Sequence, residues 1–270
     1  MTAPYYVHSD LFSYLTAFPE LAKNANSADE ISMITYKAMK ADLNEISYGQ
    51  LIVPTYNYQY SSTKVFDIIN DVSEVGQFSE LYRQDYKRYR STVPIFSSCS
   101  ELNTNTTDIV EAEIDPFGPD SDFDMLVNSG GNIITFGSAF APTFLIFIEK
   151  QYPGGSIYRY EKIFAGTVLD NAGIKNQTKL INFVKPIQIN FKYDLFKIEE
   201  ELKDYGILEN YILRDKFSYT ICNAANFLEH MLNRLNSDPL YFLTKETTDL
   251  LHETGALKKG RILSENYEVQ

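Results

Sequence analysis

Histidine, cysteine and tryptophan are nearly absent from this 270-residue chain, which holds three His, two Cys and no Trp. Cys99 and Cys222 are too few for a disulfide framework, and we expect two reduced, partly buried thiols. His8, His230 and His252 do not stand at a spacing typical of metal ligands. Nothing local therefore supports Cys–His or Ser–His–Asp catalysis, and the sequence assigns no catalytic residue.

Positive charge is also scarce. The chain has 24 Lys and Arg against 36 Asp and Glu, a formal net charge of −12, and residues 91–149 contain no Lys or Arg at all. Binding to phosphate backbones or to anionic lipids depends on Lys and Arg. The composition therefore argues against a general nucleic-acid-binding protein and against docking on an anionic membrane.

Long apolar runs are missing as well. The run Phe144–Ile148 is far shorter than the roughly 20 residues that a membrane-spanning helix needs. The N-terminus lacks a basic stretch followed by an apolar core, so we expect no signal peptide. These features favour a location in the cytoplasm or in a virion.

What the sequence does contain is a set of strand patterns around a Pro-Gly-Gly turn at 153–155. The unbroken apolar run before the turn is typical of a strand with both faces covered, whereas the segment after it alternates between apolar and polar residues. We expect strands near 51–60, 132–137, 143–150 and 156–168, with a further candidate at 180–191. These strands predict an α+β fold with a mainly antiparallel sheet.

Helical patterns lie on both sides of this region. Ser27 and Glu30 form a capping-box pattern at the start of one helix. Apolar periodicity predicts further helices within 5–24, 61–89, 195–205 and 217–235. We find no repeat and no linker, and we expect a single domain over 1–270, with a candidate helical subdomain at 192–256.

An acidic loop offers a candidate metal site. Asp120, Asp122 and Asp124 follow a D-x-D-x-D spacing that can bring carboxylates together on a hard cation. A calcium loop of the EF-hand type needs Gly at its sixth position and Glu at its twelfth, where this chain has Met125 and Gly131. A looser Ca²⁺ or Mg²⁺ site is therefore weighed against a solvated acidic loop, and no other cofactor is expected.

Phosphate-transfer motifs are incomplete. Gly137-Ser138 suggests a nucleotidyltransferase loop, but only Glu149 follows it, whereas such a loop needs two carboxylates for magnesium. There is no G-x-x-x-x-G-K-[ST] pattern either. The sequence argues against phosphoryl transfer.

A basic, tyrosine-rich segment directly precedes the acidic one. The residues that we expect at a protein interface are Tyr82, Arg83, Tyr86, Lys87, Arg88, Tyr89, Arg90 and, in the acidic segment, Asp115. Complementary charges within one chain favour contacts between copies or with other protein subunits.

From these features we expect a structural assembly subunit, such as a virus or phage particle component, rather than an enzyme. The alternatives are a metal-assisted hydrolase that uses the acidic loop, and an acidic binding protein or inhibitor for a basic partner.

Overall fold

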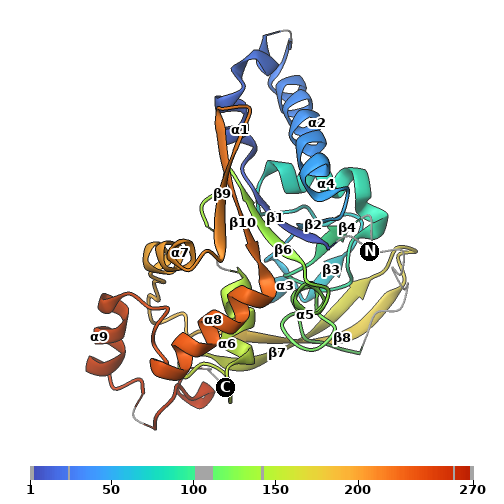
Figure 1. Ribbon diagram of the computed structural model, residues 1–270. Coiled ribbons are helices and arrows are strands. Elements are labelled where there is room, and N and C mark those ends of the chain that lie inside the picture. The colour runs from blue at the N-terminus through green and yellow to red at the C-terminus, as the bar shows by residue number, and fades with distance from the viewer. Residues whose placement is uncertain (1–2, 24, 101–111, 141–142, 258, 268–270) are drawn as a thin grey trace.

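The computed structural model describes residues 3–23, 25–100, 112–140, 143–257 and 259–267, and its architecture is α+β (Figure 1). The strands are β1 (Tyr5–Ser9), β2 (Leu51–Pro54), β3 (Val65–Asp67), β4 (Ser98–Ser100), β5 (Glu113–Ile114), β6 (Asn132–Phe136), β7 (Tyr160–Leu169), β8 (Lys175–Val184), β9 (Leu208–Leu213) and β10 (Phe217–Asn223). The α-helices are α1 (Leu11–Ala17), α2 (Ala28–Ser47), α3 (Tyr60–Thr63), α4 (Gln77–Tyr86), α5 (Asp122–Asn128), α6 (Thr143–Gln151), α7 (Leu195–Asp204), α8 (Ala224–Ser237) and α9 (Lys245–Glu253). Short 3-10 helices cover Pro19–Ala22, Lys87–Tyr89 and Ser264–Asn266.

The larger sheet has six strands in the order β4-β2-β1-β6-β10-β9. At its centre β1 is parallel to both neighbours, with Tyr6 opposite Ile52 on β2 and Ile133 on β6. The outer strands β4, β10 and β9 pair antiparallel. The sheet is therefore mixed, and the expectation of a mainly antiparallel sheet is wrong at its core.

Helices cover both faces of this sheet. Alternate side chains of β1 enter different cores: Val7 packs with residues of α1, α2 and α4, whereas Tyr6 packs with residues of α5, α6, α7 and α8. Figure 1 shows α2 and α4 on one side of the sheet and α5, α6 and α8 on the other. Burial on both faces is the usual setting of parallel strands, which explains why the central strands carry few charges.

The smaller sheet has four strands in the order β3-β7-β8-β5. Its long antiparallel hairpin pairs Tyr160 on β7 with Val184 on β8 and continues to the pair Leu169 and Lys175. This hairpin lies beside α6 and leads back to the C-terminal helices (Figure 1).

Several expected elements are confirmed, and others have different bounds. The strands expected near 132–137 and 156–168 are β6 and β7. The strand expected at 51–60 is shorter and corresponds to β2, and the candidate at 180–191 corresponds to β8, which starts and ends earlier. The capping prediction is also correct, because the Ser27 hydroxyl accepts a hydrogen bond from the Glu30 backbone N–H at 3.2 Å.

The strand expected at 143–150 is wrong, because these residues form α6. Its buried side chains include Phe144, Leu145, Phe147 and Ile148, so apolar residues meet the core around much of the helix. Periodicity cannot separate such a buried helix from a buried strand, and neighbouring elements decide between them.

Three helix expectations also need correction. Residues 5–24 begin with the strand β1, and the short helix expected there is α1, which ends before Pro19. Residues 61–89 divide into α3, β3, a turn, α4 and a 3-10 helix. The stripe at 217–235 is the strand β10 followed by α8, whose N-cap is the side chain of Asn223. Segment 192–256 therefore contains the β9–β10 hairpin as well as helices.

Among the described residues, no helix combines the length and the apolar character that crossing a bilayer requires.

Candidate functional site

A cavity lies where the three parallel strands end. β1, β2 and β6 finish at Ser9, Pro54 and Phe136, and β1 has one parallel neighbour on each side. Open α/β sheets bind ligands at such a point, because the chains leaving neighbouring strands diverge and open a crevice. This strand-end cavity has a volume of about 350 Å³ and is lined by His8, Ser9, Pro54, Tyr56, Tyr58, Val75, Ser79, Ser138, Ala139, Phe140, Thr143 and Leu195.

A glycine starts the turn that closes one wall. Gly137, directly after β6, has a φ of +79°, which favours glycine over other residues. A Cβ at Gly137 would also stand 2.7 Å from the Phe217 ring. The chain can therefore turn beside β10 and present Ser138 to the cavity.

Three polar atoms of this cavity are buried and have no hydrogen-bond partner in the part of the chain that the structure describes: Nε2 of His8 and the hydroxyl oxygens of Ser9 and Ser138. Most buried polar groups in folded proteins are paired, since an unmet hydrogen bond costs about 1–3 kcal/mol. These three atoms in one cavity offer hydrogen-bonding positions to a ligand that enters it.

The electrostatics keep His8 neutral. Burial lowers the pKa of His8 to about 4, so its imidazole is uncharged near pH 7. The neutral ring carries a lone pair on one nitrogen and can accept a proton from a nucleophile. The Tyr6 ring stands 5.4 Å from the His8 ring and covers one side of it.

A hydrogen-bonded layer lies beneath the cavity. The hydroxyls of Tyr6 and Tyr56 are 2.5 Å apart, and burial raises the pKa of Tyr56. Nearby, the Ser98 hydroxyl donates to the Asp122 carboxylate at 2.5 Å, and burial raises the pKa of that carboxyl. The first of these bonds fixes the hydroxyl of the lining residue Tyr56.

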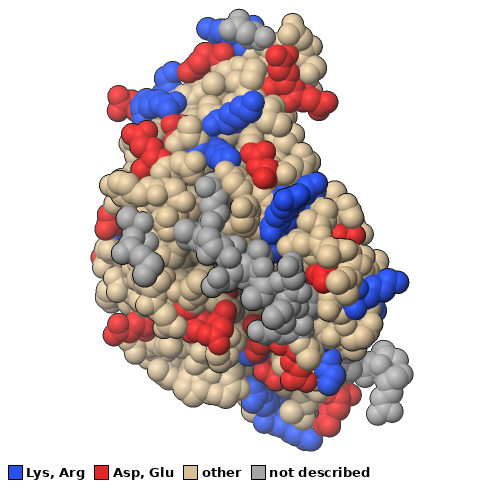
Figure 2. All heavy atoms as spheres, turned by 90° about the vertical axis from the view of Figure 1, so that its right-hand side faces the viewer, with Lys and Arg blue, Asp and Glu red and all other residues tan. Residues whose placement is uncertain are grey.

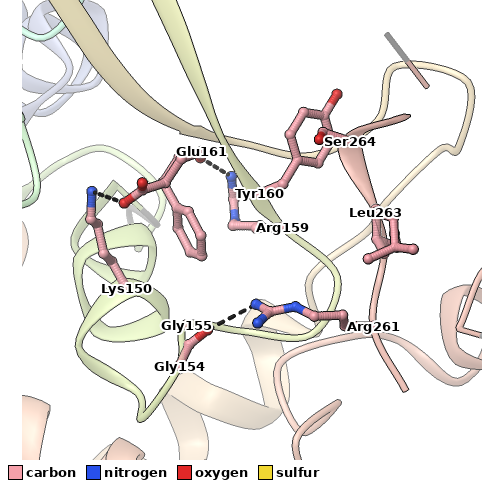
Figure 3. Close-up of a pocket in the computed structure, with 11 residues that line it drawn as sticks. Lys150, Gly154, Gly155, Arg159, Tyr160, Glu161, Arg261, Leu263 and Ser264 are labelled. Carbon is pink, nitrogen blue, oxygen red and sulfur yellow. Dashed lines mark hydrogen bonds and ion pairs between the residues drawn. The ribbon is translucent and has the colours of Figure 1, made fainter. Parts of the chain in front are cut away.

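A second cavity, of about 400 Å³, lies between the end of α6, the start of β7 and the segment 261–264 (Figure 3). We call it the C-terminal cavity. It is lined by Lys150, Gly154, Gly155, Arg159, Tyr160, Glu161, Phe183, Arg261, Ile262, Leu263 and Ser264. Figure 3 shows Lys150 directed toward Glu161, and their charged atoms are 3.1 Å apart.

The charged groups of the C-terminal cavity are paired. Arg159 donates to the Glu149 carboxylate at 2.5 Å, to the backbone oxygen of Phe183 at 2.8 Å and to the Tyr193 hydroxyl. Arg261 donates to the backbone oxygen of Gly154 at 2.8 Å (Figure 3). No described residue lining this cavity has a buried polar atom without a partner, so the cavity is a weaker candidate for a ligand site.

The acids expected to bind a metal have separate partners. Asp120 and Asp124 are linked through a backbone N–H at 3.1 Å, whereas Asp122 accepts its hydrogen bond from Ser98. Ser121 caps α5, so Asp122 and Asp124 lie in the first turn of that helix. Within the described ranges, no three His, Cys, Asp or Glu residues are placed to hold a metal ion. A metal at these three aspartates stays a prediction.

The expected interface residues divide into two groups. Tyr82, Arg83 and Arg90 are buried. Arg90 donates to the backbone oxygens of Thr55 at 2.6 Å and Asp71 at 2.5 Å, so it holds loops together inside the protein.

The other members lie at or near the surface. Lys87, Arg88 and Tyr89 are exposed, whereas Tyr86 packs its ring 4.5 Å from that of Tyr82. Asp115 is paired with Lys150 at 2.5 Å. Figure 2 shows acidic and basic side chains interspersed over the face it presents. Contacts with other subunits through these residues stay a prediction.

Sequence reasoning missed the three residues with unmet polar atoms. His8 and Ser9 end a strand that was not expected, and Ser138 was considered only as part of a phosphate-binding loop. The signal was present in the run Tyr5–Ser9, since an apolar strand that ends in polar residues before the helix-capping Asp10 is typical of a strand–loop–helix site.

Comparison with known proteins gives a likeness of fold. No protein-family model and no curated protein matches the chain. Among solved structures, a mutant of the aminoglycoside acetyltransferase AAC(3)-IVa in complex with gentamicin superposes with a TM-score of 0.61 at 15% identity, over 92% of this chain and 88% of that one. AAC-IIIb in a binary complex with CoASH gives 0.61 at 14% identity, over 87% and 90%. Sisomicin-bound AAC-VIa gives 0.62 at 13% identity, over 87% and 92%.

These values show that the chain has an AAC(3)-like fold over nearly its full length. Because this fold is that of acetyltransferases, it overturns our expectation of a structural assembly subunit or virion component. Our inclination against an enzyme is corrected by the same finding.

Proposed function

We propose that this protein is an acyltransferase, which moves an acyl group from an acyl-CoA thioester to a nucleophile held in the strand-end cavity. The observation that carries the proposal is the group of unmet polar atoms on His8, Ser9 and Ser138. The fold supports it, since the structural neighbours are acetyltransferases and one of them was solved with CoASH.

His8 is the proton acceptor in this proposal. Its Nε2 takes the proton of an acceptor hydroxyl or amine as the oxygen or nitrogen attacks the thioester carbon. The carbon–sulfur bond breaks, the new carbon–oxygen or carbon–nitrogen bond forms, and the His8 imidazolium gives its proton to the released thiolate, which restores the neutral ring. A neutral imidazole is the form that this step requires, and burial keeps His8 in that form near pH 7.

Ser9 and Ser138 orient the reacting carbonyl. A hydroxyl donor aimed at the carbonyl oxygen stabilises the negative charge that develops there during attack, typically by about 3–4 kcal/mol. Their oxygens have no partner among the described residues, so each hydroxyl is available to a ligand.

The residues present fit the reactive end of such a donor. The acyl-CoA supplies the activated acyl group, and its thioester arm is uncharged. The described lining residues of the cavity are uncharged as well. A thioester can therefore enter without burying an unpaired charge.

The first experiment measures binding and transfer separately. Calorimetry with acetyl-CoA and with CoA tests for the donor site, and release of free CoA thiol with a panel of hydroxyl and amine acceptors tests for transfer. We expect His8→Gln to lower kcat by at least about 100-fold, the usual contribution of a general base. The same substitution at the exposed His252 is the matched control and leaves kcat unchanged.

Two results would contradict the proposal. One is the absence of any binding of acetyl-CoA or CoA to the folded protein. The other is transfer that His8→Gln and Ser138→Ala leave at the wild-type rate.

A further inference from the structure

No described residue that lines the strand-end cavity is charged, although the protein as a whole carries a net charge of −12. Its 12 described lining residues contribute aromatic rings, aliphatic side chains, hydroxyls and the neutral His8. An acidic protein could readily place a carboxylate at a ligand site, so an uncharged lining limits which molecules can bind.

The acids nearest to the lining residues along the chain are engaged elsewhere. Asp10, next to Ser9, accepts from the Phe12 N–H at 2.9 Å and from the Ser13 hydroxyl at 2.7 Å. Glu74, next to Val75, accepts from the backbone N–H of Tyr58 at 2.5 Å.

Asp194 precedes the lining residue Leu195. It caps α7 by accepting from the Lys197 N–H at 3.1 Å. All three carboxylates therefore stabilise local structure, and none of them is among the described residues that line the cavity.

Charge makes a large difference in such a site. An aliphatic amine has a pKa near 10 and is protonated at pH 7. Moving an ammonium group out of water without a paired carboxylate is costly, whereas a hydroxyl can replace its water contact with a hydrogen bond to Nε2 of His8.

The walls of the strand-end cavity favour a ligand with a flat apolar group. Tyr56 and Phe140 are buried at 3% and 6% exposure and present their rings to the cavity, with Val75 and Leu195 beside them. A volume of about 350 Å³ is at the small end of ligand cavities. One small aromatic or aliphatic group fits this space.

On the basis of the proposed function, we infer that the acceptor is an uncharged aromatic or aliphatic molecule with a hydroxyl as its nucleophile, rather than a polycation. Gentamicin and sisomicin, which the structural neighbours bind, carry several amines. Two proteins with the same fold would then differ in the charge of the acceptor.

A matched pair of probes tests this inference without any acyl donor. 2-Phenylethanol and 2-phenylethylamine share one carbon skeleton and differ near pH 7 by a single positive charge. Ligand-detected NMR on the 270-residue protein measures both dissociation constants, with sisomicin as a third probe. We expect the alcohol to bind at least about tenfold more tightly than the amine, because only the amine must lose its charge or bury it unpaired.

A pair of variants tests whether the uncharged lining causes the preference for the alcohol. Leu195→Asp places one carboxylate at the partly exposed wall, and Leu195→Asn has nearly the same size without the charge. We expect 2-phenylethylamine to bind at least about tenfold more tightly to the Asp variant than to the Asn variant, in a manner weakened by salt. The affinity for 2-phenylethanol should be the same in both.

The inference is overturned if the wild-type protein binds the amine or sisomicin as tightly as the alcohol, if it binds neither phenyl probe, or if the two Leu195 variants do not differ. The proposed function fails by a different readout, namely the absence of acetyl-CoA binding. An acyltransferase that prefers sisomicin would keep the function and disprove only the acceptor class.

Discussion

The strand-end cavity and the C-terminal cavity treat their polar groups in opposite ways. In the C-terminal cavity, Arg159 donates to Glu149 at 2.5 Å, and Lys150 lies between Asp115 and Glu161. In the strand-end cavity none of the lining residues that the structure describes is charged, and buried polar atoms of three of their side chains have no partner in the described ranges.

This difference distinguishes polar groups that stabilise the fold from polar groups that are available to a ligand. A paired charge in a protein interior is held by the fold and is costly to disturb, whereas an unmet polar group lowers stability until a ligand binds it. The larger cavity is therefore the weaker candidate for a ligand site, and the smaller one is the candidate for chemistry.

The largest effect is expected when the pairing of the C-terminal cavity is broken. Arg159→Met leaves Glu149 buried without its cation, although the hydroxyls of Tyr158 and Tyr193 still donate to it. We expect the free energy of unfolding to fall by about 3–5 kcal/mol, measured by urea denaturation.

An exposed ion pair serves as the control for that variant. Lys179 lies 3.4 Å from Glu113, and both side chains are more than half exposed. Lys179→Met should change stability by less than about 1 kcal/mol. Equal losses in the free energy of unfolding for Arg159→Met and Lys179→Met would mean that the buried ion pair contributes no more to stability than the exposed one.

The second effect is a pH dependence that comes from the strand-end cavity. The pKa of His8 is about 4 in the folded protein and 6.5 in the unfolded chain, so between these values only the unfolded chain binds the proton. Stability is full above pH 6.5 and falls by about 3 kcal/mol as the pH drops to 4. Urea titrations across this range should show that His8→Gln removes this part of the slope.

The same substitution at His252, which is exposed, should leave the slope as in the wild type. A wild-type slope in the His8→Gln variant would mean that His8 is not buried in its neutral form.

The smallest effect distinguishes an unmet hydroxyl from a paired one. Ser138→Ala removes a buried oxygen without a partner, and we expect stability to be unchanged or to rise by up to about 1 kcal/mol. Ser97 is its matched control, because its hydroxyl accepts from Arg90 at 3.1 Å and donates to the Thr55 backbone oxygen at 2.8 Å. Ser97→Ala should lower stability by about 1–3 kcal/mol.

Thermal and urea unfolding of both serine variants checks this contrast. A similar loss at Ser138 and Ser97 would show that the Ser138 hydroxyl already has a partner in the free protein.

Local signals explain the parts of the fold that the sequence predicted. The Ser27 cap, the strand at 132–136 and the helix from Leu195 each depend on residues within a few positions of one another. The prediction of a strand at 143–150 is wrong because its apolar residues are buried around much of α6. An unbroken apolar run of this length fits a buried helix as well as a buried strand.

The candidate site was less accessible to such reasoning. His8 and Ser138 come from different strands, and only the parallel pairing of β1 with β6 brings the two strand ends to one cavity. Arg90 is a second example of this limit. Its place in a basic run predicted an interface residue, whereas in the structure its guanidinium donates to backbone oxygens inside the protein.

By itself, the sequence determined the α+β class, the acidic character, several helix and strand positions, and the scarcity of groups able to act as a base. The tertiary structure alone decided which charges are paired and which polar atoms are left for a ligand. The physical reason is that pairing and burial depend on neighbours that are distant along the chain, whereas caps, turns and apolar periodicity depend on neighbours within one or two turns of helix.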